Sequence, residues 1–357
     1  MSDQTFFKHQ LLCKHNCFKV QRENTLSVIE CENYIYRSIS TADFIESVSK
    51  KPAMTTKPIY KEYFIQSNRI KLHYLDWGGS GQPLVLLHGL GDSPYIFEGI
   101  ANSLKKNFRI IAYSKRGHCK SETTDSLYDN STLVSDLKLL LDSLNIKKAN
   151  LLGWSMAGNE ITEFAIQYPE RTNRLIYFEG GYDLSDESFK TIYKKVHKLL
   201  QPDSIVLQSI DAYREWYHNS WFGDIELNTV IEANLTASTL INPDGSVTTI
   251  PDNNVFKLLI ESAMSYHRDY EKIQSPALAI YTKSFFYPPG KDEETVNIYR
   301  NMEENIINPW RQSSINKIKS ELKKVTIKEM PNGTHTSLIF LDRDFIIESV
   351  NSFLLNK

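Results

Sequence analysis

The hexapeptide GWSMAG at residues 153–158 restricts the fold of this chain more than any other segment. It follows the apolar run at residues 149–152 and precedes a helical stretch. A serine between small residues two positions away on each side is typical of a sharp strand-to-helix turn that exposes the serine Oγ atom. Gly153 and Ala157 hold those positions, where a larger side chain would collide with the strand or the helix. The pattern predicts a nucleophile at Ser155, although a serine that only caps a helix gives a similar motif.

Strands and helices alternate from residue 60 to residue 178. Residues 83–87, for example, form a continuous apolar run that is typical of a parallel strand buried on both faces. Such alternation predicts an α/β fold with a doubly wound, mostly parallel sheet. We expect strands at residues 60–66, 70–76, 83–87, 108–113, 149–153, 174–178, 276–281 and 325–328. We expect helices at residues 95–106, 131–144, 159–168, 292–320 and 343–355.

The alternation stops at residues 184–270, which read as helices and loops with many aromatic side chains. We predict that this segment is a helical cap inserted over the carboxyl ends of the strands. The core domain then consists of residues 58–183 together with residues 271–357.

Residues 1–57 form an N-terminal extension without strand alternation, which we expect to be poorly ordered. Two histidines and two cysteines lie close together in it: His9, Cys13, His15 and Cys17. Their spacing matches no standard zinc site, so we favour a weakly ordered amphipathic helix over metal binding. Met54 is a plausible start codon, so residues 1–53 are either a loosely attached extension or sequence upstream of the start.

Composition excludes several classes of partner. The 357 residues carry a net charge of −2, which argues against binding to nucleic acid or to an anionic membrane surface. The sequence contains no run of about twenty apolar residues, so we predict no membrane span. The N-terminus lacks the apolar core of a secretory signal, and four cysteines are too few for a disulfide framework, so we expect a cytoplasmic protein. Composition specifies no oligomeric state.

From about residue 60 onward the chain resembles α/β-hydrolases with a helical cap. Besides the turn at residues 153–158, the segment HGLGDS at residues 88–93 directly follows the third expected strand. Residues 114–121 lie where this family usually has Asp-x-Arg-Gly-x-Gly-x-Ser, here with Ser and Cys in place of Asp and the second Gly. A late histidine, His335, follows the last expected strand. The resemblance implies the α/β-hydrolase fold.

The resemblance also implies roles for particular residues. Ser155 is the expected nucleophile, and a serine hydroxyl needs a base to remove its proton. His335 is the expected base, because it fits the family order of serine, acid and histidine. The backbone N–H groups of Leu90 and Met156 are the expected oxyanion hole. We expect His88 to be structural rather than a second base.

The acid is the least regular part of the pattern. Most relatives place an Asp after the strand expected at residues 276–281, but residues 282–289 contain no carboxylate. A minority place the acid at the tip of the preceding strand, where Glu179 lies. We favour Glu179, with Asp183 and Asp292 as alternatives and the absence of a functional acid left open.

We therefore expect a serine hydrolase that forms an acyl-enzyme on Ser155 and acts on a small to medium apolar ester or thioester, because the cap is rich in aromatic residues. The main alternative is a C–C bond hydrolase with the same triad. A non-catalytic binding protein of the α/β-hydrolase fold is the second alternative. The expected partner is a small-molecule substrate, and this chemistry requires no metal and no organic cofactor.

Overall fold

The computed structural model describes most of the chain and divides it into two compact units, Met1–Lys57 and Pro58–Lys357. The described residues are 17–20, 28–31, 34–37, 59–67, 69–196, 201–223, 225–286 and 292–356. Among them, no helix has the length and apolar character needed to cross a membrane.

The described part of the first unit is an antiparallel sheet in the order β1-β2-β3. Its strands are β1 (Cys17–Val20), β2 (Val28–Cys31) and β3 (Tyr34–Arg37). The amphipathic helix that we favoured around the segment from His9 to Cys17 lies outside the described residues, except for Cys17, which begins β1. The other residues considered as metal ligands, His9, Cys13 and His15, lie outside the described residues.

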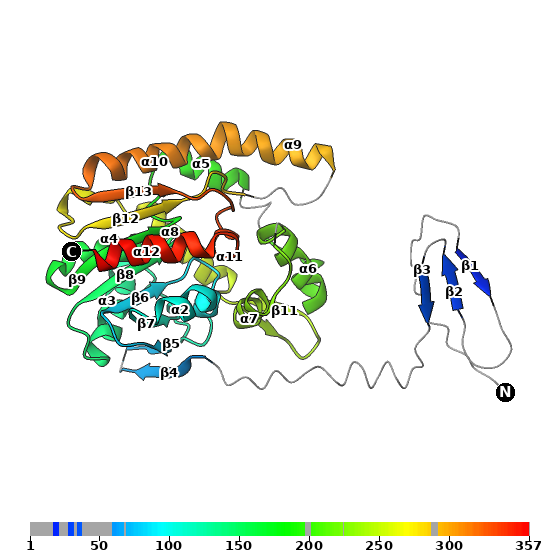
Figure 1. The fold of residues 1–357 in the computed structure, drawn as a ribbon, viewed down its shortest axis with the longest axis horizontal. Coiled ribbons are helices and arrows are strands. Elements are labelled where there is room, and N and C mark those ends of the chain that lie inside the picture. The colour runs from blue at the N-terminus through cyan, green and yellow to red at the C-terminus, as the bar shows by residue number, and fades with distance from the viewer. Residues whose placement is uncertain are drawn as a thin grey trace. The chain divides into compact units, whose positions relative to one another are not determined.

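The second unit is built on an eight-stranded sheet in the order β13-β12-β9-β8-β6-β7-β5-β4 (Figure 1). Its strands are β4 (Lys61–Gln66), β5 (Lys71–Gly78), β6 (Pro83–Leu87), β7 (Arg109–Tyr113), β8 (Ala149–Trp154), β9 (Thr172–Phe178), β12 (Ala277–Tyr281) and β13 (Val325–Glu329). The strands from β13 to β7 pair in parallel, while β5 pairs antiparallel with β7 and with β4. The predicted doubly wound, mostly parallel α/β sheet is confirmed.

Helices cover both faces of this sheet. One face carries α2 (Glu98–Leu104) and α12 (Arg343–Leu355), and the other carries α3 (Asn130–Ser143), α4 (Ala157–Gln167) and α10 (Asn308–Glu321). Along β6, Leu84 and Leu86 pack with α2 and α12, whereas Val85 and Leu87 pack with α3 and α4. Successive strand residues point to opposite faces, so both faces need apolar side chains. This is why the sequence of β6 is a continuous apolar run.

Between β9 and β12 the chain forms the segment that we expected to be a helical cap. Its helices are α5 (Glu187–Val196), α6 (Ile210–Trp221), α7 (Thr229–Ala237) and α8 (Asn253–Ser265). The last three of these helices each have an N-cap residue whose side-chain oxygen accepts hydrogen bonds from the first backbone N–H groups. These N-cap residues are Ser209, Asn228 and Asp252. A short hairpin of β10 (Thr239–Ile241) and β11 (Val247–Thr249), which the sequence did not predict, lies between α7 and α8.

The long polar helix predicted at residues 292–320 contains an interruption. α9 (Glu293–Met302) is followed by a π-helical turn, η5 (Glu303–Ile307), and then by α10. A π turn inserts an extra residue into the helix and rotates the side chains that follow. In this turn Glu303 is buried and accepts hydrogen bonds from the backbone N–H groups of Phe285 and Phe286 at 2.6 and 3.3 Å. The interruption therefore fixes the loop that follows β12.

Removal of residues 1–53 should leave the second unit folded. All buried residues of the described hydrophobic clusters lie between Ile65 and Leu354, so the shortened chain keeps the core that drives folding. We expect the urea midpoint and the m value for unfolding of residues 54–357 to equal those of the full chain. A lower midpoint for the shortened chain would contradict this expectation.

Candidate active site

Ser155 lies in a tight turn between β8 and α4, as the hexapeptide pattern predicted. Its φ angle is 57°, a left-handed conformation that is strained for a residue with a side chain. A Cβ atom on Gly153 would lie 2.7 Å from the carbonyl oxygen of Ala157, so only glycine fits at that position. The turn is held by a backbone hydrogen bond from Ser155 N to the carbonyl oxygen of Phe178 in β9.

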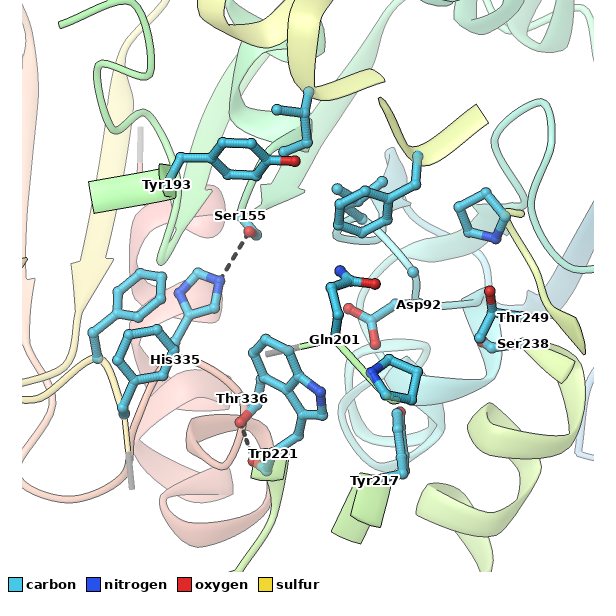
Figure 2. Close-up of a pocket in the computed structure, with 18 of the residues that line it drawn as sticks. Asp92, Ser155, Tyr193, Gln201, Tyr217, Trp221, Ser238, Thr249, His335 and Thr336 are labelled. Carbon is cyan, nitrogen blue, oxygen red and sulfur yellow. Dashed lines mark hydrogen bonds between the residues drawn. The ribbon is translucent and has the colours of Figure 1, made fainter. Parts of the chain in front are cut away.

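The structure brings Ser155, His335 and Glu179 into one hydrogen-bonded chain. His335 Nε2 lies 2.8 Å from Ser155 Oγ, and His335 Nδ1 lies 2.9 Å from Glu179 Oε2 (Figure 2 shows the first of these contacts). A carboxylate can only accept hydrogen bonds, which assigns the imidazole proton to Nδ1. Nε2 is then free to accept the proton of the serine hydroxyl.

The two alternative acids lie elsewhere. Asp183 accepts hydrogen bonds from Ser185 and from Arg268. Asp292 is an exposed N-cap residue of α9 that accepts a hydrogen bond from Thr295 N. Neither carboxylate contacts His335, so Glu179 is the acid that the geometry supports.

Glu179 is fully buried, yet it is surrounded by donors. Its Oε1 accepts hydrogen bonds from Thr282 N at 2.6 Å and from Arg311 Nη2 at 2.9 Å, and its Oε2 accepts one from Tyr182 OH at 2.9 Å. Burial alone would raise the pKa of this carboxyl group, but the Arg311 guanidinium and the bond to His335 lower the pKa to about 2. Glu179 is therefore charged at neutral pH and can stabilise a protonated imidazole.

The backbone also holds Glu179 in a strained position. Its φ angle is 45°, and Gly180 follows it directly. A Cβ atom on Gly180 would lie 2.9 Å from the carbonyl oxygen of Gly153. The glycine allows the chain after β9 to pass close to the turn that carries Ser155.

The imidazole ring is fixed by its neighbours. Phe285 stacks on His335 with ring centroids 4.1 Å apart and an interplanar angle of 18°. The backbone N–H of His335 donates to the carbonyl oxygen of Phe285 at 3.0 Å, and Trp154 Nε1 donates to the carbonyl oxygen of His335 at 3.1 Å. These contacts join the loop after β13 to the loop after β12 and to the strand that precedes the nucleophile.

Sequence reasoning missed three residues that support this arrangement: Thr282, Phe285 and Arg311. Thr282 and Phe285 lie in the loop after β12, which we had noted only for its lack of a carboxylate. That absence was the available signal, because a loop without an acid can instead donate hydrogen bonds to an acid on the neighbouring strand. Arg311 lies in a helix that read as polar along its whole length.

The residues that we expect to supply the oxyanion hole, Leu90 and Met156, lie near Ser155. A Cβ atom on Gly89 would stand 3.2 Å from Ser155 Cβ, so the loop after β6 passes close to the nucleophile, and Leu90 lines the same cavity. Among the described residues, no acceptor is found for the backbone N–H of Leu90 or of Met156, which is the N-cap residue of α4. Within the described residues, neither group is therefore used in another backbone hydrogen bond.

His88 holds the shape of that loop. It is fully buried, its Nδ1 lies 2.8 Å from the carbonyl oxygen of Gly89, and its Nε2 accepts the backbone N–H of Lys115 at 3.2 Å. Burial lowers its pKa well below the usual range, so the ring is neutral. These bonds agree with the structural role expected for His88.

Ser155 and His335 open into a cavity of about 260 Å³, whose walls come from the loops after the strands and from the cap helices (Figure 2). Much of the wall is aromatic, including Trp216, Trp221, Phe222, Phe285, Phe286 and Trp310. Among the described lining residues there is no Lys or Arg, and Asp92 is the one carboxylic acid. Within the described part of the chain, no three His, Cys, Asp or Glu side chains form a group that could hold a metal ion.

Known proteins share this architecture. The family model described as alpha/beta hydrolase fold matches residues 82–225. The solved structure of E-2-(acetamidomethylene)succinate hydrolase aligns with a TM-score of 0.64 and 16% identity over 83% of this chain and 100% of that one. The chain therefore has the α/β-hydrolase fold. The bromoperoxidase from Bacillus anthracis also aligns, with a TM-score of 0.60 and 20% identity over 83% of this chain and 100% of that one.

Curated relatives match a shorter stretch. A 2-hydroxy-6-oxononadienedioate/2-hydroxy-6-oxononatrienedioate hydrolase from Paraburkholderia phymatum is 32% identical over 38% of this chain and 48% of that protein. A cis-3-alkyl-4-alkyloxetan-2-one decarboxylase from Shewanella oneidensis is 32% identical over 36% of this chain and 41% of that protein. The match therefore spans less than half the length of each relative.

Replacing Arg311 by Met should lower the free energy of unfolding by an amount that depends on pH. In the wild type, Glu179 contributes stability that is present above its ordinary pKa of 4.5 and is lost as pH falls through about 2. Without the guanidinium, burial acts against the charged carboxyl, and we expect a loss of about 3–5 kcal/mol at neutral pH. This loss should shrink as pH falls and Glu179 takes up a proton.

Urea titrations over a range of pH measure this difference. The exposed Arg300 in α9, changed to Met, is the control and should show no such dependence. A loss in the Arg311 variant that is the same at every pH would mean that this arginine acts only through packing.

Proposed function

We propose that this chain is a serine hydrolase that acts through an acyl-enzyme on Ser155. The observation that carries the proposal is the chain of hydrogen bonds from Ser155 Oγ through His335 to the buried, charged Glu179, with distances of 2.8 and 2.9 Å. A nucleophile, a base within hydrogen-bond reach and a third group that orients the base are the parts that covalent hydrolysis requires.

The proposed acylation step follows from these positions. Ser155 Oγ attacks the substrate carbonyl carbon while His335 Nε2 accepts the hydroxyl proton, and Glu179 stabilises the imidazolium that forms. When the tetrahedral intermediate collapses, Nε2 returns the proton to the leaving alkoxide or thiolate. Water then attacks the acyl-enzyme with the same base, which releases the acid and restores the serine.

The negative charge of the tetrahedral intermediate needs donors that are already in place. We assign this role to the backbone N–H groups of Leu90 and Met156. Each such donor lowers the barrier by about 3–4 kcal/mol in well-studied hydrolases. Met156 is also the N-cap residue of α4, whose dipole favours negative charge at its N-terminus.

The cavity supports an uncharged acyl substrate. Its volume of about 260 Å³ suits a small to medium group, and its aromatic wall favours apolar atoms. We therefore propose an apolar carboxylic ester or thioester as the substrate class, with carboxylic ester hydrolysis as the main activity.

Two alternatives receive less support. The hydrolase from Paraburkholderia phymatum is named for dioate substrates, which carry two carboxylates, and the described residues of this cavity offer no Lys or Arg to bind them. A protein that only binds a ligand would gain nothing from two strained residues, Ser155 and Glu179, whose left-handed backbone costs roughly 1–3 kcal/mol each.

A fluorophosphonate probe should label the wild type on Ser155, because the probe reacts with serines activated by a base. Ser155→Ala should abolish labelling. Ser238 lines the same cavity, and Ser238→Ala is the matched control that should keep full labelling. Folded wild-type protein that resists the probe would favour the binding protein.

Glu179→Gln should slow acylation by on the order of 10³- to 10⁴-fold, because the imidazole loses the charge that fixes its tautomer and stabilises its protonated form. Single-turnover kinetics with an activated ester measures this step. Circular dichroism checks that the variant is folded. Asp292→Asn should leave the rate unchanged; the opposite pattern, a slow Asp292 variant and a normal Glu179 variant, would show that Glu179 is not the acid.

A further inference from the structure

Asp92 is a carboxylic acid in a cavity whose wall is otherwise mostly apolar. It lies in the loop after β6 that also carries Leu90, it is half-buried, and it lines the same space as Ser155 and His335 (Figure 2). The proposed reaction scheme gives it no role.

The cap holds Asp92 in place. Asn234 in α7 is fully buried, and its Nδ2 donates to Asp92 Oδ1 at 3.0 Å and to Tyr217 OH at 2.7 Å. Its Oδ1 accepts hydrogen bonds from the backbone N–H and from the hydroxyl of Ser93, at 2.8 and 2.6 Å. The amide of Asn234 therefore fixes both the loop after β6 and the orientation of the Asp92 carboxyl group.

The second oxygen of Asp92 lies close to the reacting atoms. The point where a Cβ atom on Gly89 would stand is 2.9 Å from Asp92 Oδ2 and 3.2 Å from Ser155 Cβ. Among the described residues, no donor is found for Oδ2. A substrate bound to Ser155 would therefore share a small space with this oxygen.

Several titratable groups face Asp92. His335 lies across the cavity, and Tyr213 and Tyr217 face it from α6. His118 accepts the backbone N–H of the neighbouring Gly91. The charge of Lys115 also lowers the pKa of Asp92. However, Lys115 Nζ is buried and lies 3.1 Å from Glu160 Oε1, with which it forms an ion pair.

The effect of burial on the pKa of Asp92 is larger than the opposing effects of the Asn234 hydrogen bond and of the charges on His335 and Lys115. The pKa of Asp92 is therefore raised to about 6. The carboxyl group is neutral below that pH and negatively charged above it.

We propose that Asp92 makes the cavity select against substrates that carry a negative charge. This inference rests on the proposed ester hydrolysis and names the residue that determines its substrate class. A carboxylate on the substrate would meet the like charge of Asp92 in a space with little water, and like charges brought together in this way are strongly disfavoured. An uncharged ester of the same size meets no such repulsion.

Two esters with the same leaving group test this inference: para-nitrophenyl pentanoate, which is neutral, and the para-nitrophenyl ester of 4-sulfobutanoic acid, whose sulfonate is negatively charged throughout the pH range. The quantity measured is the ratio of kcat/KM for the neutral ester to kcat/KM for the anionic ester, from about pH 5 to about pH 8. Because both esters have the same leaving group and use the same catalytic groups, effects on the shared chemical step cancel in the ratio.

In the wild type the ratio should rise about tenfold or more as pH passes through about 6, because Asp92 becomes charged. In Asp92→Asn the ratio should be lower by a similar factor at the higher pH and should not change with pH. Asp211 is an exposed carboxylate in α6, so Asp211→Asn removes the same charge from the surface and should behave as the wild type.

A wild-type ratio that stays close to 1 at every pH in this range overturns the inference and needs no variant, so a failure of Asp92→Asn to fold does not affect the test. Hydrolysis of both esters with an unchanged ratio in Asp92→Asn also overturns it, but leaves the proposed function intact. If neither ester is hydrolysed and the fluorophosphonate probe leaves Ser155 unlabelled, the proposed function fails and this inference fails with it.

Discussion

A carboxylate without access to water is stable only if other groups compensate its charge, and the proposed active site of this molecule is organised around that requirement. Glu179 is fully buried and obtains its donors from several elements: Arg311 in α10, Thr282 after β12, Tyr182 after β9 and His335 after β13. Each donor ties its own element to the tip of β9. The same contacts that keep Glu179 charged therefore place the imidazole against Ser155.

The order of the strands explains why an acid on β9 can serve. The strands β13, β12, β9 and β8 are consecutive neighbours in the sheet and run in parallel, so their carboxyl ends lie along one edge. Glu179 follows the strand next to the one that carries Ser155, and His335 follows the strand on the far side of β12. Thr282, at the end of β12, donates to Glu179 instead of supplying the acid itself.

Local patterns, read together with the family resemblance, predicted Ser155, Glu179 and His335 as the site residues: Glu179 directly follows a predicted strand, and each of the three has a glycine within two residues. The doubly wound sheet was predictable for the same reason, since apolar runs alternate with helical periods. Arg311 was not predictable, because its burial depends on the π turn that interrupts the helix before it. The strands β1 to β3 were missed because they are only four residues long, and such short runs have no clear period.

The central claim is that Glu179 holds the His335 ring with its proton on Nδ1 and leaves Nε2 free to take the proton of Ser155. Nitrogen-15 NMR of the imidazole, with His335→Gln to assign the signals, reports directly which nitrogen carries the proton. We predict the Nδ1–H form at neutral pH in the wild type and a shift toward the Nε2–H form in Glu179→Gln. An Nε2–H ring in the wild type would contradict it, because no base would then face the serine.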